Sequence, residues 1–184
     1  RQVLKICACI GNRFELETVA VIIDRSLDET LSLLGIALNE TLISAESSLY
    51  RFFHDRIQEA AYAMLTPAEK GRLHYRIGRL ALERTGPDEL RDRIFYIVDH
   101  LNYDPSIASD TRERRDIARL NLIAGRKSSA SAAYDAALHY YGAGISLLDD
   151  AAWSEAYDLA IALHVAAGEA CYLTGAHGRM DSLF

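Results

Sequence analysis

Apolar residues recur every three to four positions over most of the chain, which is the spacing of one face of an α-helix. In the first part this spacing covers residues 16–23 and 27–38 and returns over 57–65. Between these stretches lie two short segments, 41–45 and 49–53, which are rich in β-branched, aliphatic or aromatic residues and are separated by polar ones. The pattern predicts helix, helix, β-hairpin, helix.

The rest of the chain has the helical pattern alone. The expected helices carry apolar stripes over 73–81, 88–101, 115–127, 134–148 and 153–171, the last with Trp153, Tyr157, His164 and Cys171 on one face. We therefore predict a mainly α fold with one short β-hairpin.

Two helix starts are marked by the capping-box pattern. Ser26 is followed three residues later by Glu29, and Thr66 by Pro67 and then Glu69. In this pattern the hydroxyl accepts from a backbone N–H of the first turn while the carboxylate reaches back to the cap. Helices are expected to begin at these positions.

The order of elements predicts two domains. Residues 1–66 are compatible with a winged-helix-like unit, and 67–184 with an array of helical hairpins that is truncated at its C-terminus. In the second region Gly125, Ala137 and Tyr141 have the small–small–aromatic character of a tetratricopeptide repeat, and Gly168 repeats part of it after 43 residues. Because that repeat is about 34 residues long, the region is tetratricopeptide-like rather than a regular array.

Composition excludes several classes of protein. The 184 residues carry a formal charge of −6 and are 50% hydrophobic, and no apolar run reaches the roughly 20 residues of a membrane span. A winged helix often binds DNA, but the expected recognition helix carries Asp28, Glu29 and Glu40 and no Lys or Arg. Because these acids would repel phosphates, we do not expect nucleic acid as a partner. Because no apolar run is long enough to span a bilayer, we do not expect a membrane either.

The three cysteines, Cys7, Cys9 and Cys171, have no partners at zinc-site spacing. An odd count without a secretory segment is typical of a cytoplasmic protein with reduced, buried thiols.

The segment Gly125-Arg126-Lys127-Ser128 resembles a phosphate loop only superficially, since it lies between helices. Adjacent acids occur only at predicted helix ends, so an enzyme site is a distant third hypothesis.

His54 is the candidate binding residue. It lies where the second strand of the hairpin gives way to a helix, and Asp55 is expected to cap that helix. Free N–H groups at a helix start favour anions, and an imidazole N–H beside them could donate to a phosphate oxygen. From the residues alone, the alternative that His54 only ends the strand and packs is favoured.

A family resemblance shifts that balance. Phe53-His54-Asp55 resembles the Met-His-Asp motif in the winged-helix domain of STAND-class signalling ATPases, with Phe53 in place of Met. Further similar blocks are Ala8 to Phe14, Phe53 to Tyr62, Ala118 to Leu122, Ala124 to Lys127 and Tyr172 to Gly175. In this order they resemble large bacterial signalling proteins that join a Ser/Thr-kinase-like domain, an AAA/STAND ATPase, helical repeats, a GAF domain and a sensor histidine kinase.

The resemblance implies a non-catalytic regulatory fragment. His54 would contact the β-phosphate of ADP, Asp55 would support it, and the upstream nucleotide-binding domain of the same chain would be the partner. The fragment itself would hold no cofactor or metal, while the full-length kinase would use ATP or ADP with Mg. The alternative is a plain protein-interaction scaffold, in which a protein partner docks on the helical repeats beside exposed Tyr140, Trp153 or Tyr157.

Overall fold

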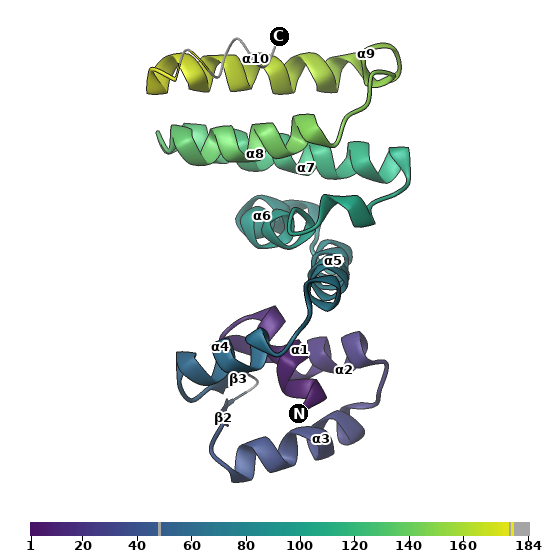
Figure 1. Cartoon of the computed structure of the whole chain (residues 1–184), viewed down its shortest axis with the longest axis vertical. Coiled ribbons are helices and arrows are strands. Elements are labelled where there is room, and N and C mark those ends of the chain that lie inside the picture. Colours follow the sequence, from purple (N-terminus) through teal and green to yellow (C-terminus); the bar gives the residue numbers. More distant parts are fainter. Residues whose placement is uncertain (48, 177, 179–184) are drawn as a thin grey trace. The chain divides into compact units, whose positions relative to one another are not determined.

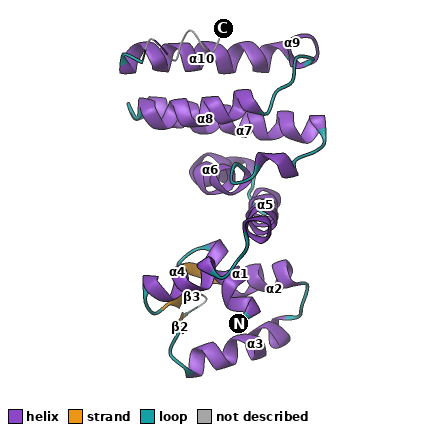
Figure 2. Ribbon diagram, viewed as in Figure 1, coloured by secondary structure: helices purple, strands orange, loops and turns teal. Residues whose placement is uncertain are grey.

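The computed structural model describes residues 1–47, 49–176 and 178. Helices make up most of the regular structure, and the strands belong to the first part of the chain (Figure 2). The prediction of a mainly α fold is confirmed. Two compact units are present, Arg1–Ile77 and Gly78–Phe184, and they divide inside a long helix. The domain boundary predicted after residue 66 lies at the start of that helix and stays a prediction.

The first unit joins helices to a small sheet (Figure 1). Its elements are α1 (Gln2–Ile10), β1 (Arg13–Glu15), α2 (Leu16–Ile23), α3 (Leu27–Asn39), β2 (Ile43–Glu46), β3 (Leu49–Phe52), α4 (Asp55–Ala63) and the start of α5 (Pro67–Glu83). The sheet is antiparallel in the order β1-β3-β2, with Phe14 opposite Tyr50 and Ile43 opposite Phe52. The predicted hairpin is therefore present, and β1 adds a third strand that the pattern did not indicate.

Side chains on one face of the sheet are buried, and they pack against the helices of the first unit. Phe14, Ile43 and Phe52 are buried, and the Phe14 and Phe52 rings lie 5.8 Å apart. Helix α1 contributes the fully buried Cys7, and α2 the fully buried Val19. One face of the sheet and the apolar stripes of the helices thus form the core of the first unit.

The second unit consists of helices. They are the end of α5, α6 (Pro87–Leu101), the 3₁₀ turn η1 (Pro105–Ile107), α7 (Thr111–Ala130), α8 (Tyr134–Ser146), α9 (Ala152–Glu155) and α10 (Tyr157–Thr174). Helices α7 and α8 form a hairpin, and α10 packs on α8 (Figure 1).

Glycine permits the close approach of α7 and α8. A Cβ placed on Gly125 would collide with Cε1 of the Tyr141 ring, so only a residue without a side chain fits beneath the ring. Tyr141 is buried, and its hydroxyl shares a 3.1 Å hydrogen bond with Ser129. The small–small–aromatic pattern therefore marks a close helix contact. The expectation that Gly125 to Ser128 lie between helices is wrong: they belong to α7, and they do not form a phosphate-binding loop.

Two hydrogen-bonded amides, one buried and one half-buried, join the C-terminal end of α6 to α7. Asn121 is fully buried, and its side chain donates to Asn102 Oδ1 at 2.9 Å and to the Ile117 carbonyl at 3.1 Å. The Asn102 amide donates in return to Asn121 Oδ1 at 2.8 Å. Because the buried Asn121 amide is satisfied only by these partners, the pair fixes the register of the two elements.

One predicted helix is wrong in its extent. The pattern indicated a single helix from Trp153 to Cys171, but the backbone breaks at Ala156 with φ −142° and ψ 40°, which separates α9 from α10. Trp153 and Tyr157 therefore do not share the buried face and are exposed. His164 is buried and its Nδ1–H donates to the Ala160 carbonyl at 2.8 Å, so it is a core histidine with a satisfied ring nitrogen.

Candidate functional site

The hairpin leads directly into α4 at His54. This residue is the N-cap of α4, with an extended backbone at φ −140° and ψ 143°, and its carbonyl accepts from the Ile57 N–H at 2.9 Å. The imidazole is exposed and meets the Phe53 ring edge-on, with the centroids 4.9 Å apart. The predicted change from strand to helix is present at His54. The ring is open to solvent, whereas the residues alone favoured a packed side chain.

Asp55 does not cap this helix. It is the first residue of α4, and no side chain provides a capping hydrogen bond at His54. Instead, Asp55 Oδ1 accepts from Asn12 Nδ2 at 2.9 Å. The expected cap is therefore corrected: the helix begins one residue too early for the Asp55 side chain to reach the second or third N–H of the first turn.

Asn12 is the residue that sequence reasoning missed at this site. Its side chain holds Asp55, and its backbone carbonyl accepts from the Phe52 N–H at 3.0 Å. The Phe53 N–H donates in turn to the Leu42 carbonyl at 3.0 Å. The end of β3 and the start of α4 are thus fixed on both sides of His54. A signal was present, because Asn12 lies in one of the blocks that carry the resemblance.

The charges around His54 are of both signs. Arg56 is exposed in the first turn of α4, and Arg13 is opposite Arg51 in the sheet. Arg51 is already paired, since its Nε lies 2.8 Å from Glu46 Oε1. The uncapped helix start and the exposed imidazole can receive an anion such as a phosphate group, while Asp55 in the first turn adds a negative charge beside them.

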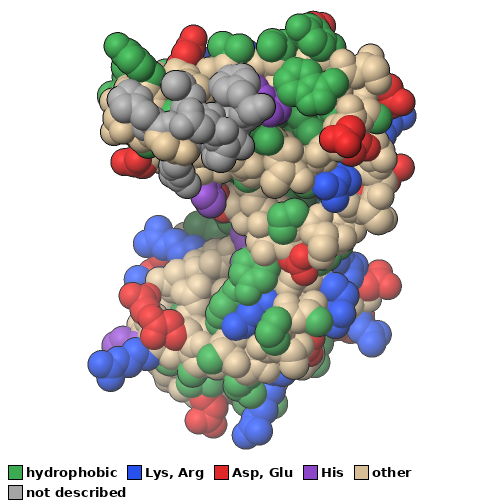
Figure 3. Space-filling model, turned by 45° about the horizontal axis from the view of Figure 1, so that its top comes forward, with side chains coloured by type: hydrophobic (Ala, Val, Ile, Leu, Met, Phe, Trp, Pro, Cys, Tyr) green, Lys and Arg blue, Asp and Glu red, His purple; other side chains and the backbone are tan. Residues whose placement is uncertain are grey.

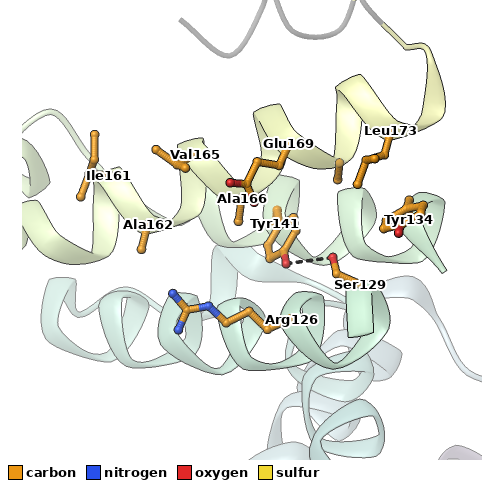
Figure 4. A pocket seen from close by; sticks show the side chains of 11 residues that line it. Arg126, Ser129, Tyr134, Tyr141, Ile161, Ala162, Val165, Ala166, Glu169 and Leu173 are labelled. Carbon is orange, nitrogen blue, oxygen red and sulfur yellow. Dashed lines mark hydrogen bonds between the residues drawn. The ribbon is translucent and has the colours of Figure 1, made fainter. Parts of the chain in front are cut away.

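A groove in the second unit is the other candidate site (Figure 4). It has a volume of about 460 Å³ and lies between α7, α8 and α10. Its lining includes Arg126, Tyr134, Tyr141, Val165 and Glu169. Apolar walls with one charge of each sign are typical of a surface that holds a peptide or small molecule.

The aromatic residues expected at a docking surface are divided. Tyr140 is buried and its hydroxyl donates to Asp99 at 3.0 Å; burial and this bond raise the pKa of Tyr140 to about 12. Trp153 and Tyr157 are 45% and 55% exposed, with ring centroids 6.3 Å apart. Tyr140 is thus a packing residue, whereas the other two are accessible.

The described residues contain no group of three or more His, Cys, Asp or Glu side chains that could hold a metal ion. All three cysteines are free and buried. No helix in the described part of the chain is long and apolar enough to span a bilayer. Hydrophobic, acidic and basic side chains are interspersed over the face of the molecule that Figure 3 shows.

Comparison with known proteins gives one relative. The whole chain aligns at 22% identity with the hybrid signal transduction histidine kinase G of Dictyostelium discoideum. The chain spans 7% of the length of that relative. No protein-family profile matches the chain, and no solved structure matches it.

Proposed function

We propose that the chain is a regulatory segment of a signal-transduction kinase and has no catalytic activity of its own. In this proposal a winged-helix-like first unit contacts a nucleotide-binding domain upstream in the same chain, and the tetratricopeptide-like helices carry the change of state onward. The observation that carries the proposal is the exposed imidazole of His54 at the start of α4. The similarity to a histidine kinase supports the signalling context.

In this proposal, a hydrogen bond between His54 and bound ADP holds the protein in one of two states. ADP held by the upstream domain would receive a hydrogen bond from the imidazole N–H of His54, beside the open N–H groups of α4. A charge-assisted hydrogen bond of this type contributes about 1.5–3 kcal/mol. Since about 1.4 kcal/mol corresponds to a factor of ten, its loss shifts a two-state equilibrium at least tenfold.

The proposal assigns nucleotide and Mg to the full-length kinase rather than to this segment. With most of the phosphate ligands on another domain, the 184-residue chain alone is expected to bind ADP weakly at best. We place the protein in the cytoplasm, where free thiols stay reduced. The STAND-type ATPase module and the bacterial origin implied by the resemblance stay predictions.

The test replaces His54 in the full-length protein. We expect His54→Ala to lower ADP retention about tenfold or more and to change signalling output, because the phosphate loses its donor. His139→Ala is the matched control, since His139 is also exposed but lies in α8. Unchanged ADP affinity together with unchanged signalling in His54→Ala would remove the role assigned to this residue.

A second function is favoured by the accessible aromatic residues. Trp153 and Tyr157 are exposed, and a groove lies between α7, α8 and α10, as a protein-interaction scaffold requires. In that case Trp153→Ser abolishes capture of the partner while ADP retention stays at the level of the unchanged protein. Loss of ADP retention with normal partner capture in His54→Ala favours the switch instead.

A further inference from the structure

Helix α3 exposes more apolar surface than a solvated helix needs. Leu27, Leu31, Leu33 and Ile36 are all exposed, and Ile36 reaches 75% and Leu33 52%. The core contacts of this helix come from Thr30, Leu34 and Ala37, which are buried. Helical spacing places Leu33 and Ile36 on one side of α3, apart from Leu27 and Leu31, and this pair is the more exposed of the two.

Helical spacing arranges part of this surface into a stripe. Glu29, Leu33, Ile36 and Glu40 follow one another at steps of four, three and four residues, so they lie on the same side of α3. We call these four residues the α3 stripe. It has two apolar side chains in the middle and an acid at each end, and the acids are about 16 Å apart along the axis.

A hollow lies beside the stripe. It has a volume of about 500 Å³, opens to solvent, and is lined by Arg25, Asp28, Glu29, Ser32 and Leu33. The stripe therefore has, on one flank, room for a side chain of a docked partner.

The charge of α3 is negative, and the basic residues that flank its segment, Arg25 and Arg51, pair with Glu29 and Glu46 and not with Glu40. No Lys or Arg occurs between Ser26 and Tyr50. Glu29 is held in the capping box and lies 3.9 Å from Arg25, but Glu40 is the C-cap of α3, and the last turn of the helix contains no basic residue. A carboxylate at the negative end of a helix dipole is unfavourable, and a cation placed there from outside would relieve it.

We propose that the α3 stripe is a docking site for a basic amphipathic helix of a protein partner. The partner would place two aliphatic residues against Leu33 and Ile36, and a Lys or Arg near Glu29 and near Glu40. The acids disfavour a nucleic acid or an anionic membrane at the same surface, because both would bring negative charge. This inference is independent of the role proposed for His54.

The probe is a synthetic alanine-based helical peptide with the complementary pattern. It carries lysine, leucine, isoleucine and lysine at the spacing of Glu29, Leu33, Ile36 and Glu40, and the control peptide has glutamate in place of each lysine. Binding to the 184-residue chain is measured by titration calorimetry. We expect the lysine peptide to bind and the glutamate peptide to bind at least about tenfold more weakly.

Variants of the chain locate the site. Leu33→Ser combined with Ile36→Ser lowers the affinity for the lysine peptide about tenfold or more, and both sites are exposed, so the helix keeps its fold. Glu40→Lys also lowers the affinity and reduces its dependence on salt, while it improves the match to the helix dipole. Glu59→Lys on α4 and Tyr172→Ser on α10 are the controls, since both residues are exposed elsewhere, and they leave the affinity unchanged.

Four results overturn the proposal. The first is equal binding of the two peptides, and the second is unchanged binding by the Leu33 and Ile36 double variant. The third is a dimer in sedimentation that the double variant abolishes, which assigns the stripe to a second copy of this chain. The fourth is binding of the chain to phosphatidylserine vesicles through the same residues, which assigns it to a membrane.

Discussion

At the residue scale, the Gly125–Tyr141 pair shows how much a single missing methyl group decides. The ring occupies the space in which any Cβ of residue 125 would lie. Because the ring is buried and bonded to Ser129, it cannot swing away cheaply. The distance between α7 and α8 is therefore set by glycine at this one position.

We expect Gly125→Ala to lower the free energy of unfolding by about 1–3 kcal/mol or more, because the added methyl overpacks against Tyr141. Gly142→Ala is the matched control: a Cβ there meets nothing within 4 Å, so the change should stabilise the helix by about 0.5–1 kcal/mol. Urea unfolding measures both variants. Equal effects of the two substitutions would show that the helix pair adapts to the extra methyl.

Some residues of the candidate site around His54 could be predicted from the sequence, and others could not. His54 was predictable because a change of period from two to 3.6 falls on it. The identity of the cap was not, since His54 and Asp55 differ by one position and the choice depends on a backbone torsion angle. Asn12 lies far from Asp55 in the sequence, so no local pattern could pair them.

At the scale of elements, local sequence signals predicted where helices begin better than where a helix is interrupted. Both capping boxes are formed: the Glu29 N–H donates to Ser26 Oγ at 3.3 Å, and the Glu69 N–H to Thr66 Oγ1 at 3.3 Å. Strand β1 was missed because it has three residues and gains its stability from pairing with β3. The break at Ala156 was missed because no Gly or Pro marks it.

The capping box of α5 gives stability a pH dependence. The Thr66 N–H and hydroxyl donate to Glu69 at 2.8 Å each and hold the pKa of its carboxyl below its ordinary value. Since the folded-state pKa is the lower one, this contribution is present above the ordinary glutamate pKa and is lost as the pH falls through the lowered one.

We expect the free energy of unfolding to fall less between about pH 7 and about pH 3 in Glu69→Gln than in the unchanged protein, because the variant has no carboxylate to protonate at the cap. Urea unfolding at a series of pH values provides the measurement. Glu59→Gln, at an exposed position in the middle of α4, serves as the control and should keep the full decrease. An identical pH profile for Glu69→Gln would contradict the assigned role of the cap.

At the scale of the whole molecule, the chain divides into two units with separate cores. The first contains His54, and the second contains the groove between α7, α8 and α10. The class of fold was predictable from periodicity. The division between the two compact units leaves no mark in the sequence, because the apolar pattern runs through α5 without interruption.

Because the two units have separate cores, we expect a small change in one core to raise amide exchange in that unit alone. Ile43→Val removes one buried methyl group from the first unit and costs about 1 kcal/mol, which corresponds to roughly fivefold faster amide exchange there. Ile97→Val is the reciprocal change in the second unit. Hydrogen exchange followed by mass spectrometry should show each effect confined to its own unit. Faster exchange in both units from either change would mean that they open together.

The inaccessible thiols of this chain have a practical consequence for spectroscopy. Burial raises the pKa of Cys7, and that of Cys9 to about 11, and Cys171 has no exposed surface. Because a maleimide or a spin label reacts with an accessible thiolate, the native chain should remain unlabelled in the folded state. A single cysteine introduced at Ile36 or Tyr172 can then carry a probe without first replacing the three that are present.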